Sequence, residues 1–143
     1  MKGKVMMYNW SEQIKFHPWV GSNFNNAPRK VLLLGDSHYG ANEPYSEYTQ
    51  DVIRKWCINR AKPGRTLTGI IWTLFGNRED LEDKFSKVAF YNYVQKLMPA
   101  PRTSPSKADY ETAQKPFSNI FQSTESDYDC ESRRTLHLPE LRG

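Results

Sequence analysis

The chain has 143 residues, 38% of them hydrophobic, and a formal net charge of +4 from 20 Lys and Arg against 16 Asp and Glu. This length suits one domain, and so mild a charge permits a nucleic-acid partner without requiring one. Two cysteines outside any Cys-x-x-Cys or Cys/His cluster exclude a disulfide framework and argue against a zinc site. With no apolar run of membrane length and no secretory leader, we expect a cytoplasmic monomer without membrane contact.

The first predicted strand covers residues 31–34, four consecutive aliphatic side chains that run into Gly35. Apolar residues before it, between positions 10 and 20, are expected to cover one edge of the core. An unbroken apolar run of this length fits a strand buried on both faces of a parallel sheet. Ligands bind beyond the carboxyl ends of such strands. The next residues, Asp36, Ser37, His38 and Tyr39, are therefore predicted to form the floor of an active or binding site.

Two helices are predicted after this turn. Thr49 is a good N-cap for the first, in which Val52, Ile53, Trp56 and Cys57 recur at helical spacing. The second shows apolar residues at i, i+3, i+4, i+7 and i+8 from position 67 to 75, with Gly76 placed to end it. The charged residues 78–84 are interpreted as a further helical turn.

A second strand is predicted within residues 85–94, which are rich in aromatic and β-branched side chains. Strand, helices and strand in this order favour a right-handed βαβ crossover with parallel strands. Residues 98–105 contain three prolines and indicate an irregular loop. Ser106 then caps a third helix, residues 107–121, which Pro116 is expected to kink or end.

From residue 122 onward almost nothing can be buried, so residues 1–121 are predicted as an incomplete α/β domain and residues 122–143 as a polar, disordered or out-of-frame tail. A parallel sheet calls for one more apolar strand after the third helix. One allowed codon choice for residues 127–138, read one nucleotide earlier, spells an apolar strand followed by glycine and a helix start. The coding DNA tests this hypothesis, because a stop codon in the shifted frame would contradict it.

Three motifs resemble the uracil-DNA glycosylase-like superfamily. Val-Leu-Leu-Leu-Gly-Asp-Ser-His-Tyr-Gly, residues 31–40, looks like the family strand whose Gly-led turn activates the attacking water. Residues 88–94, with Asn92, are similar to the family strand whose Asn reads a pyrimidine edge. Lys-Pro-Phe at 115–117 looks like members whose turn reads Gly-Asp/Glu-Ser-His-Tyr. The resemblance covers residues 10–121 and implies a three-layer sandwich with a central parallel sheet, its last strand missing or degraded.

The resemblance implies hydrolysis of the N-glycosidic bond of a flipped uracil or damaged base in DNA, without metal or cofactor. Asp36 is then the general base or the electrostatic partner of water and sugar, and His38 donates to the base or positions water, its pKa lying near operating pH. Asn92 offers the donor and acceptor that uracil requires. The base would lie against Gly35 and stack on a tyrosine, the candidates being Tyr39, Tyr45 and Tyr48. The DNA phosphates would bind a basic segment, with the candidates Arg54, Lys55, Arg60, Lys62 and Arg65.

The chain departs from the family pattern in three ways. Aligned on its Gly and Tyr, the best-known family turn has Asp at the place of Ser37, one position after Asp36. The first motif is one residue shorter. The last strand and its His-bearing loop, expected after Phe121, are absent, and His137 lies in the wrong context to replace them.

Two other hypotheses on the function of the chain remain open. A Gly-Asp-Ser (SGNH) esterase also begins with a strand ending in Gly-Asp-Ser, with Ser37 as nucleophile, but it needs an Asp-x-x-His pair, and Arg134 stands three residues before His137. Alternatively the chain is a non-catalytic, truncated remnant whose sheet exposes an apolar edge, with low solubility and weakly cooperative unfolding.

Overall fold

A computed structural model describes residues 8–40, 43–59 and 65–125. The described elements are, in chain order, β1 (Trp19–Val20), a 3-10 turn η1 (Phe24–Asn26), β2 (Val31–Gly35), β3 (His38–Tyr39), α1 (Tyr48–Val52), a π-helix η2 (Ile53–Ile58), α2 (Arg65–Phe75), α3 (Leu81–Ser86), β4 (Val88–Asn92), β5 (Leu97–Met98) and α4 (Lys107–Glu125). The fold is mixed α/β, as predicted. No helix within the described ranges is long and apolar enough to cross a membrane.

The main sheet has three described strands in the order β1-β4-β2. The predicted parallel pairing is confirmed, since β2 and β4 run side by side from Val31 opposite Val88 to Gly35 opposite Asn92. The prediction of a central parallel sheet was wrong for β1, which pairs with the other edge of β4 in the antiparallel direction and makes the sheet mixed. A second, two-stranded sheet pairs β3 with β5 in parallel.

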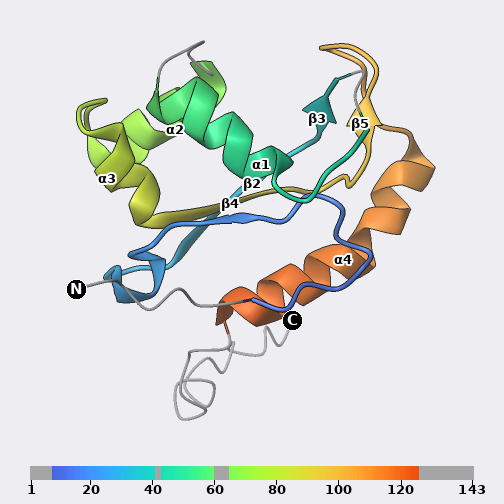
Figure 1. Ribbon diagram of the computed structural model, residues 1–143, viewed down its shortest axis with the longest axis horizontal. Coiled ribbons are helices and arrows are strands. Elements are labelled where there is room, and N and C mark those ends of the chain that lie inside the picture. The colour runs from blue at the N-terminus through green and yellow to red at the C-terminus, as the bar shows by residue number, and fades with distance from the viewer. Residues whose placement is uncertain (1–7, 41–42, 60–64, 126–143) are drawn as a thin grey trace, which may run out of the picture.

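Helices lie on both faces of the main sheet, with α1, α2 and α3 on one side and α4 on the other (Figure 1). Along β2 the side chains alternate: Leu33 packs in the cluster under α2 and α3, whereas Leu32 packs with Tyr91 and Ile120 beneath α4. Burial on both faces therefore holds in the middle of the strand. It fails at Leu34, which is 51% exposed, because β2 forms an edge of the described sheet.

The boundary between the predicted charged helical turn and the predicted second strand moves. The predicted second strand starts three residues later, at Val88, because Phe85 and Ser86 end helix α3. That helix is capped at its start by Asp80, whose carboxylate accepts a hydrogen bond from the Asp83 amide. The cap makes residues 81–86 helical, and tertiary packing places Phe85 in the core with no exposed surface.

The first predicted helix is present, but Thr49 is not its N-cap. Glu47 holds that position, and Thr49 is fully buried in the first turn. The helix continues as the π-helix η2, in which Ile53 and Cys57 face the core while Trp56 stays 41% exposed. Thr49 is buried because its hydroxyl has a partner in the turn after β2.

Helix α4 begins as predicted and runs past its proline. Ser106 Oγ accepts from the Asp109 amide at 3.2 Å, and Asp109 Oδ2 accepts from the Ser106 amide at 2.9 Å, a reciprocal cap. Pro116 neither ends the helix nor stays outside it: the helix extends to Glu125 with Pro116 buried. An interior proline costs about 3 kcal/mol; packing of Ala113 and Ile120 against the sheet side offsets this cost.

Helix α2 contains a glycine with no steric reason to be one. An added Cβ at Gly69 would meet nothing within 4 Å, and the residue lies inside the helix. Gly69→Ala is expected to raise the free energy of unfolding by about 0.5–1 kcal/mol, because alanine loses less backbone entropy on folding. Chemical denaturation of the two proteins measures this, and a lower midpoint in the variant would contradict it.

Candidate functional site

The candidate site is built where β2 and β4 end together. Gly35 and Asn92 are register partners at the last position of the paired strands. The backbone continues this pairing beyond the sheet: Tyr93 N donates to the Gly35 carbonyl and Val94 N to the Asp36 carbonyl, both at 2.9 Å. The turn after β2 is thus held against the chain that follows β4. The sequence predicted that these two segments meet.

Gly35 and Asn92 are in close contact. A Cβ added to Gly35 would overlap Asn92 Oδ1 and stand 2.9 Å from Phe90 Cζ, so any larger residue here would displace the Asn92 amide. Asn92 is 5% exposed, and its side-chain amide makes no hydrogen bond within the described ranges. Its carbonyl accepts from Gln95 Nε2 at 2.7 Å, and Gln95 Oε1 accepts from the Phe16 amide at 2.8 Å. Asn92 is therefore positioned through its backbone carbonyl, and its side-chain amide can bind a ligand.

Asp36 points to the helix below the sheet. Its side chain is exposed, and its Oδ1 accepts a 2.7 Å hydrogen bond from Tyr110 Oη on α4. This hydrogen bond to Asp36 raises the pKa of Tyr110. Tyr110 was not predicted as a site residue, although its place one turn into a capped helix after the second strand was visible in the sequence. It orients the carboxylate, whose second oxygen has no hydrogen-bond partner among the described residues.

His38 points to the opposite face. Its Nε2 lies 2.8 Å from Thr49 Oγ1 on α1, and its ring contacts Phe16 edge-on at 5.1 Å and Tyr48 at 4.7 Å. Burial lowers the pKa of His38 to about 4, so the imidazole is neutral at pH 7. The expectation of a pKa near operating pH was wrong, because the aromatic surroundings remove water. A neutral ring can still donate one hydrogen bond, and its tautomer follows from its partner.

Ser37 is nearly buried, at 9% exposed, and its Oγ has no hydrogen-bond partner among the described residues. It is not paired with His38, whose ring nitrogen is taken by Thr49. A serine nucleophile needs a base within hydrogen-bond reach. The described geometry provides none for this hydroxyl.

The tyrosines near the turn divide into two kinds. Tyr39 is 43% exposed, and its carbonyl accepts from Tyr48 Oη at 2.6 Å. Tyr45 is 42% exposed, donates its hydroxyl to Asp51 Oδ2 at 2.9 Å, and has its ring 5.2 Å from that of Tyr48. Tyr39 and Tyr45 thus present rings to solvent near the turn, as a stacking role needs, while Tyr48 braces the backbone.

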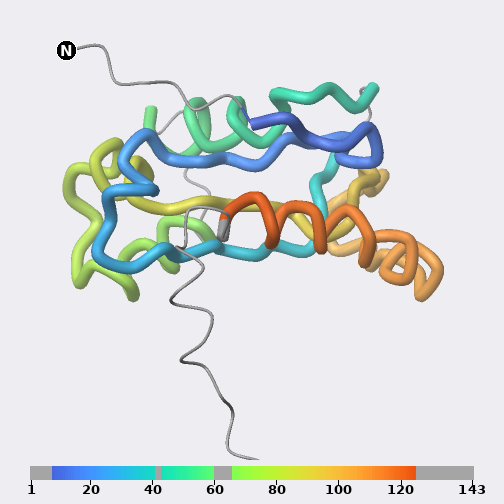
Figure 2. Tube along the Cα trace, turned by 90° about the horizontal axis from the view of Figure 1, so that it is seen from below, coloured from blue at the N-terminus to red at the C-terminus, as the bar shows by residue number. Residues whose placement is uncertain are grey.

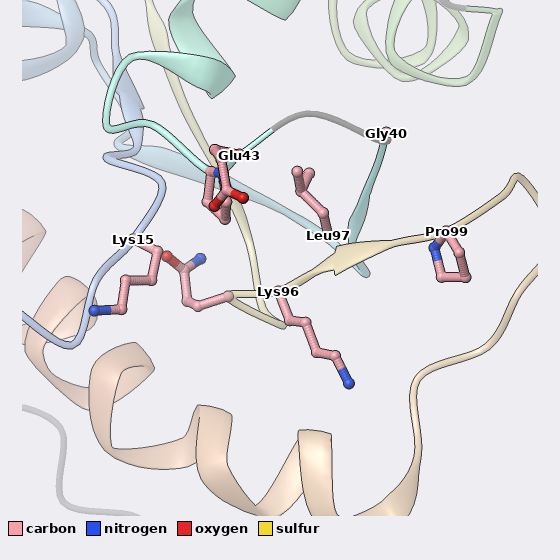
Figure 3. A pocket seen from close by; sticks show the side chains of 8 residues that line it. Lys15, Gly40, Glu43, Lys96, Leu97 and Pro99 are labelled. Carbon is pink, nitrogen blue, oxygen red and sulfur yellow. The ribbon is translucent and has the colours of Figure 1, made fainter.

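A groove of about 510 Å³ begins where the turn ends. Its lining comes from separate parts of the chain (Figure 3): Lys15, then Gly40, Glu43 and Pro44, and finally Gln95, Lys96, Leu97 and Pro99. The groove carries two lysines, of which Lys96 also pairs with Asp109 on α4 at 3.4 Å. Sequence reasoning missed it, because β5 is only two residues long and gives no periodic signal.

Two of the predicted phosphate-binding residues, Arg54 and Lys55, have described side chains and do not line this groove. Arg54 stacks its guanidinium over the Trp19 ring at 5.2 Å, and Lys55 pairs with Asp51 at 3.3 Å. Arg60 and Lys62 lie outside the described residues, as does the side chain of Arg65. The structure therefore leaves the phosphate-binding prediction open, with Arg54 and Lys55 already engaged.

The described residues thus form a mixed α/β domain whose polar turn and buried amide meet at the carboxyl end of two parallel strands. Within the described ranges, no three His, Cys, Asp or Glu side chains gather as metal ligands. Comparison with protein-family models, with curated proteins and with solved structures found no match.

Proposed function

We propose that this chain is a uracil-DNA glycosylase-like protein that acts on the N-glycosidic bond of a flipped uracil or damaged base. The proposal includes the three-layer fold of that superfamily, with β2 and β4 as a parallel pair of its sheet. The observation that carries it is the contact between Gly35 and the buried amide of Asn92, directly beside the Asp36 turn. An acidic turn and a base-reading amide are the two elements that such a reaction needs in one place.

Asn92 would read the base. Its amide offers one donor group and one acceptor, which match the carbonyl and N–H on a uracil edge. Because Asn92 is 5% exposed, a base bound there is shielded from water, and an unmatched base would leave buried polar groups unpaired. Selectivity would follow from that cost.

Asp36 would act on the sugar side of the bond. Its carboxylate, oriented by Tyr110, can accept a proton from an attacking water or stabilise the positive charge that develops on the sugar. Neutral His38 would serve as a hydrogen-bond donor rather than as an acid. The charge-bearing role therefore falls to Asp36 alone within the described site.

The esterase reading is less well supported. Ser37 Oγ lacks a partner among the described residues, and His38 is committed to Thr49. The remnant reading agrees with the exposed Leu34 at the edge of the described sheet. Glycosylase activity separates this hypothesis from the proposal, because a non-catalytic remnant would have none.

The test is incubation of the full chain with uracil- and mismatch-containing DNA, followed by detection of abasic sites. Asp36→Ala and Asn92→Ala are each expected to reduce the rate by about 100-fold or more, because each removes an interaction made with the reacting nucleotide. Asn59→Ala is the matched control, since Asn59 is exposed at the end of η2. A rate unchanged in both site variants, or turnover of a p-nitrophenyl ester lost in Ser37→Ala, would overturn the proposal.

A further inference from the structure

Strand β2 has one edge without a strand partner among the described residues. It pairs only with β4, which lies between β2 and the N-terminal strand (Figure 2). The Gly35 carbonyl accepts from Tyr93 N, which directs the backbone groups of Val31, Leu33 and Gly35 toward β4. In a parallel pair the groups of the intervening residues point the other way. The N–H and C=O of Leu32 and Leu34 therefore face outward.

Nothing in the strand itself blocks further pairing. β2 is Val-Leu-Leu-Leu-Gly, with neither a proline nor a charged side chain, the usual features that protect an edge. Leu34 is 51% exposed, and it lies on the same face as Leu32, by the alternation along the strand. The edge thus presents two backbone positions without a partner strand among the described residues, and one exposed apolar side chain.

We propose that this edge pairs with the same edge of a second copy of the chain, antiparallel and about a two-fold axis at Leu33. In this register Leu32 of each copy exchanges backbone hydrogen bonds with Leu34 of the other, which uses all the outward groups. Each exposed Leu34 then lies directly beside Leu32 of the other copy, on one face of a continuous sheet. The same patch serves both copies, as a closed two-fold interface requires.

Charge at the strand ends selects a second copy as the occupant. The register that centres on Leu33 sets Lys30 opposite Asp36 of the other copy, and does so twice. Lys30 directly precedes β2 and Asp36 directly follows it, so both lie at the ends of the edge. Lys30 Nζ lies 5.9 Å from the centroid of the Phe24 ring, and the exposed Asp36 accepts from Tyr110 through Oδ1. Solvent-exposed pairs add little affinity but penalise a wrong register, in which like charges or unpaired ends would meet. A neutral peptide strand would satisfy the backbone without using these charges.

The mass of the full chain, measured by light scattering after gel filtration across the micromolar range, tests the proposal. A discrete dimer is expected. Leu34→Lys is expected to yield a folded monomer, because it sets a charge beside Leu32 of the other copy at two places in the interface, while Leu34 is exposed in the single copy. Leu74→Lys on α2 is the matched control: Leu74 is 44% exposed, and its replacement leaves the dimer intact.

A charge exchange tests the register. Lys30→Glu and Asp36→Lys are each expected to weaken the dimer by roughly tenfold, and the double variant to recover most of that loss. Three outcomes overturn the proposal: a monomer at every concentration, as when residues 126–143 or another strand cover the edge; open-ended aggregates without a discrete dimer; or a dimer that Leu34→Lys leaves unchanged. Circular dichroism of each variant confirms that it is folded.

Discussion

Gly21→Ala is expected to lower the free energy of unfolding by about 3 kcal/mol or more, at the upper end of over-packing effects. Gly21 follows β1 and faces the junction of α3 and β4. A Cβ there would overlap the Ser86 carbonyl and stand 2.5 Å from the Phe85 carbonyl oxygen. These are backbone atoms, which cannot rotate away as a side chain does. The strand must therefore move, and its contact with β4 is lost.

Thermal unfolding followed by circular dichroism measures this effect, and a fall in the midpoint of roughly 10 °C is expected. Gly69→Ala is the control, since it makes the same chemical change where the added methyl meets nothing. The two glycines thus predict shifts of opposite sign. A Gly21→Ala midpoint within a degree or two of the unchanged protein would show that β1 is not packed as closely as described.

Acid is expected to destabilise the protein by about 3 kcal/mol between pH 6.5 and pH 4 through His38 alone. Burial lowers the pKa of His38 from 6.5 in the unfolded chain to about 4 in the folded one. Between these values the unfolded chain binds a proton that the folded one does not, so stability falls as pH falls. Well above pH 6.5 His38 is neutral in both the folded and the unfolded chain, so this loss of stability is absent.

Urea denaturation of the unchanged protein and of His38→Gln, at several pH values, isolates this contribution. Carboxyl groups such as Asp51 and Asp109, whose pKa is lowered by hydrogen bonds to Tyr45 and to Ser106 respectively, add a loss at lower pH in both proteins. The difference between the two curves is therefore the quantity of interest. An NMR titration that placed the pKa of His38 near 6.5 would contradict the burial described for it.

About half of the candidate site followed from the sequence. The strand that ends in Gly35 and the strand that ends in Asn92 were both predicted, and so was their parallel pairing. The directions of the side chains between them were not. Asp36 and His38 bond to helices on opposite faces of the sheet, through Tyr110 and Thr49. A hydrogen-bond partner 74 residues away leaves no local pattern, because it depends on where α4 docks.

The sequence by itself determined the elements that carry a strong local signal: the apolar run of β2, the helical spacing of α2 ended by Gly76, and the cap of α4 at Ser106. Gly76 adopts φ +81°, which glycine reaches without strain. Tertiary structure alone decided the rest. Two-residue strands form only when a partner supplies their hydrogen bonds, as β4 does for β1 and β3 does for β5. Pro116 stays within α4 because the buried face of that helix outweighs its local cost, and Leu34 is exposed because no described strand lies beyond β2.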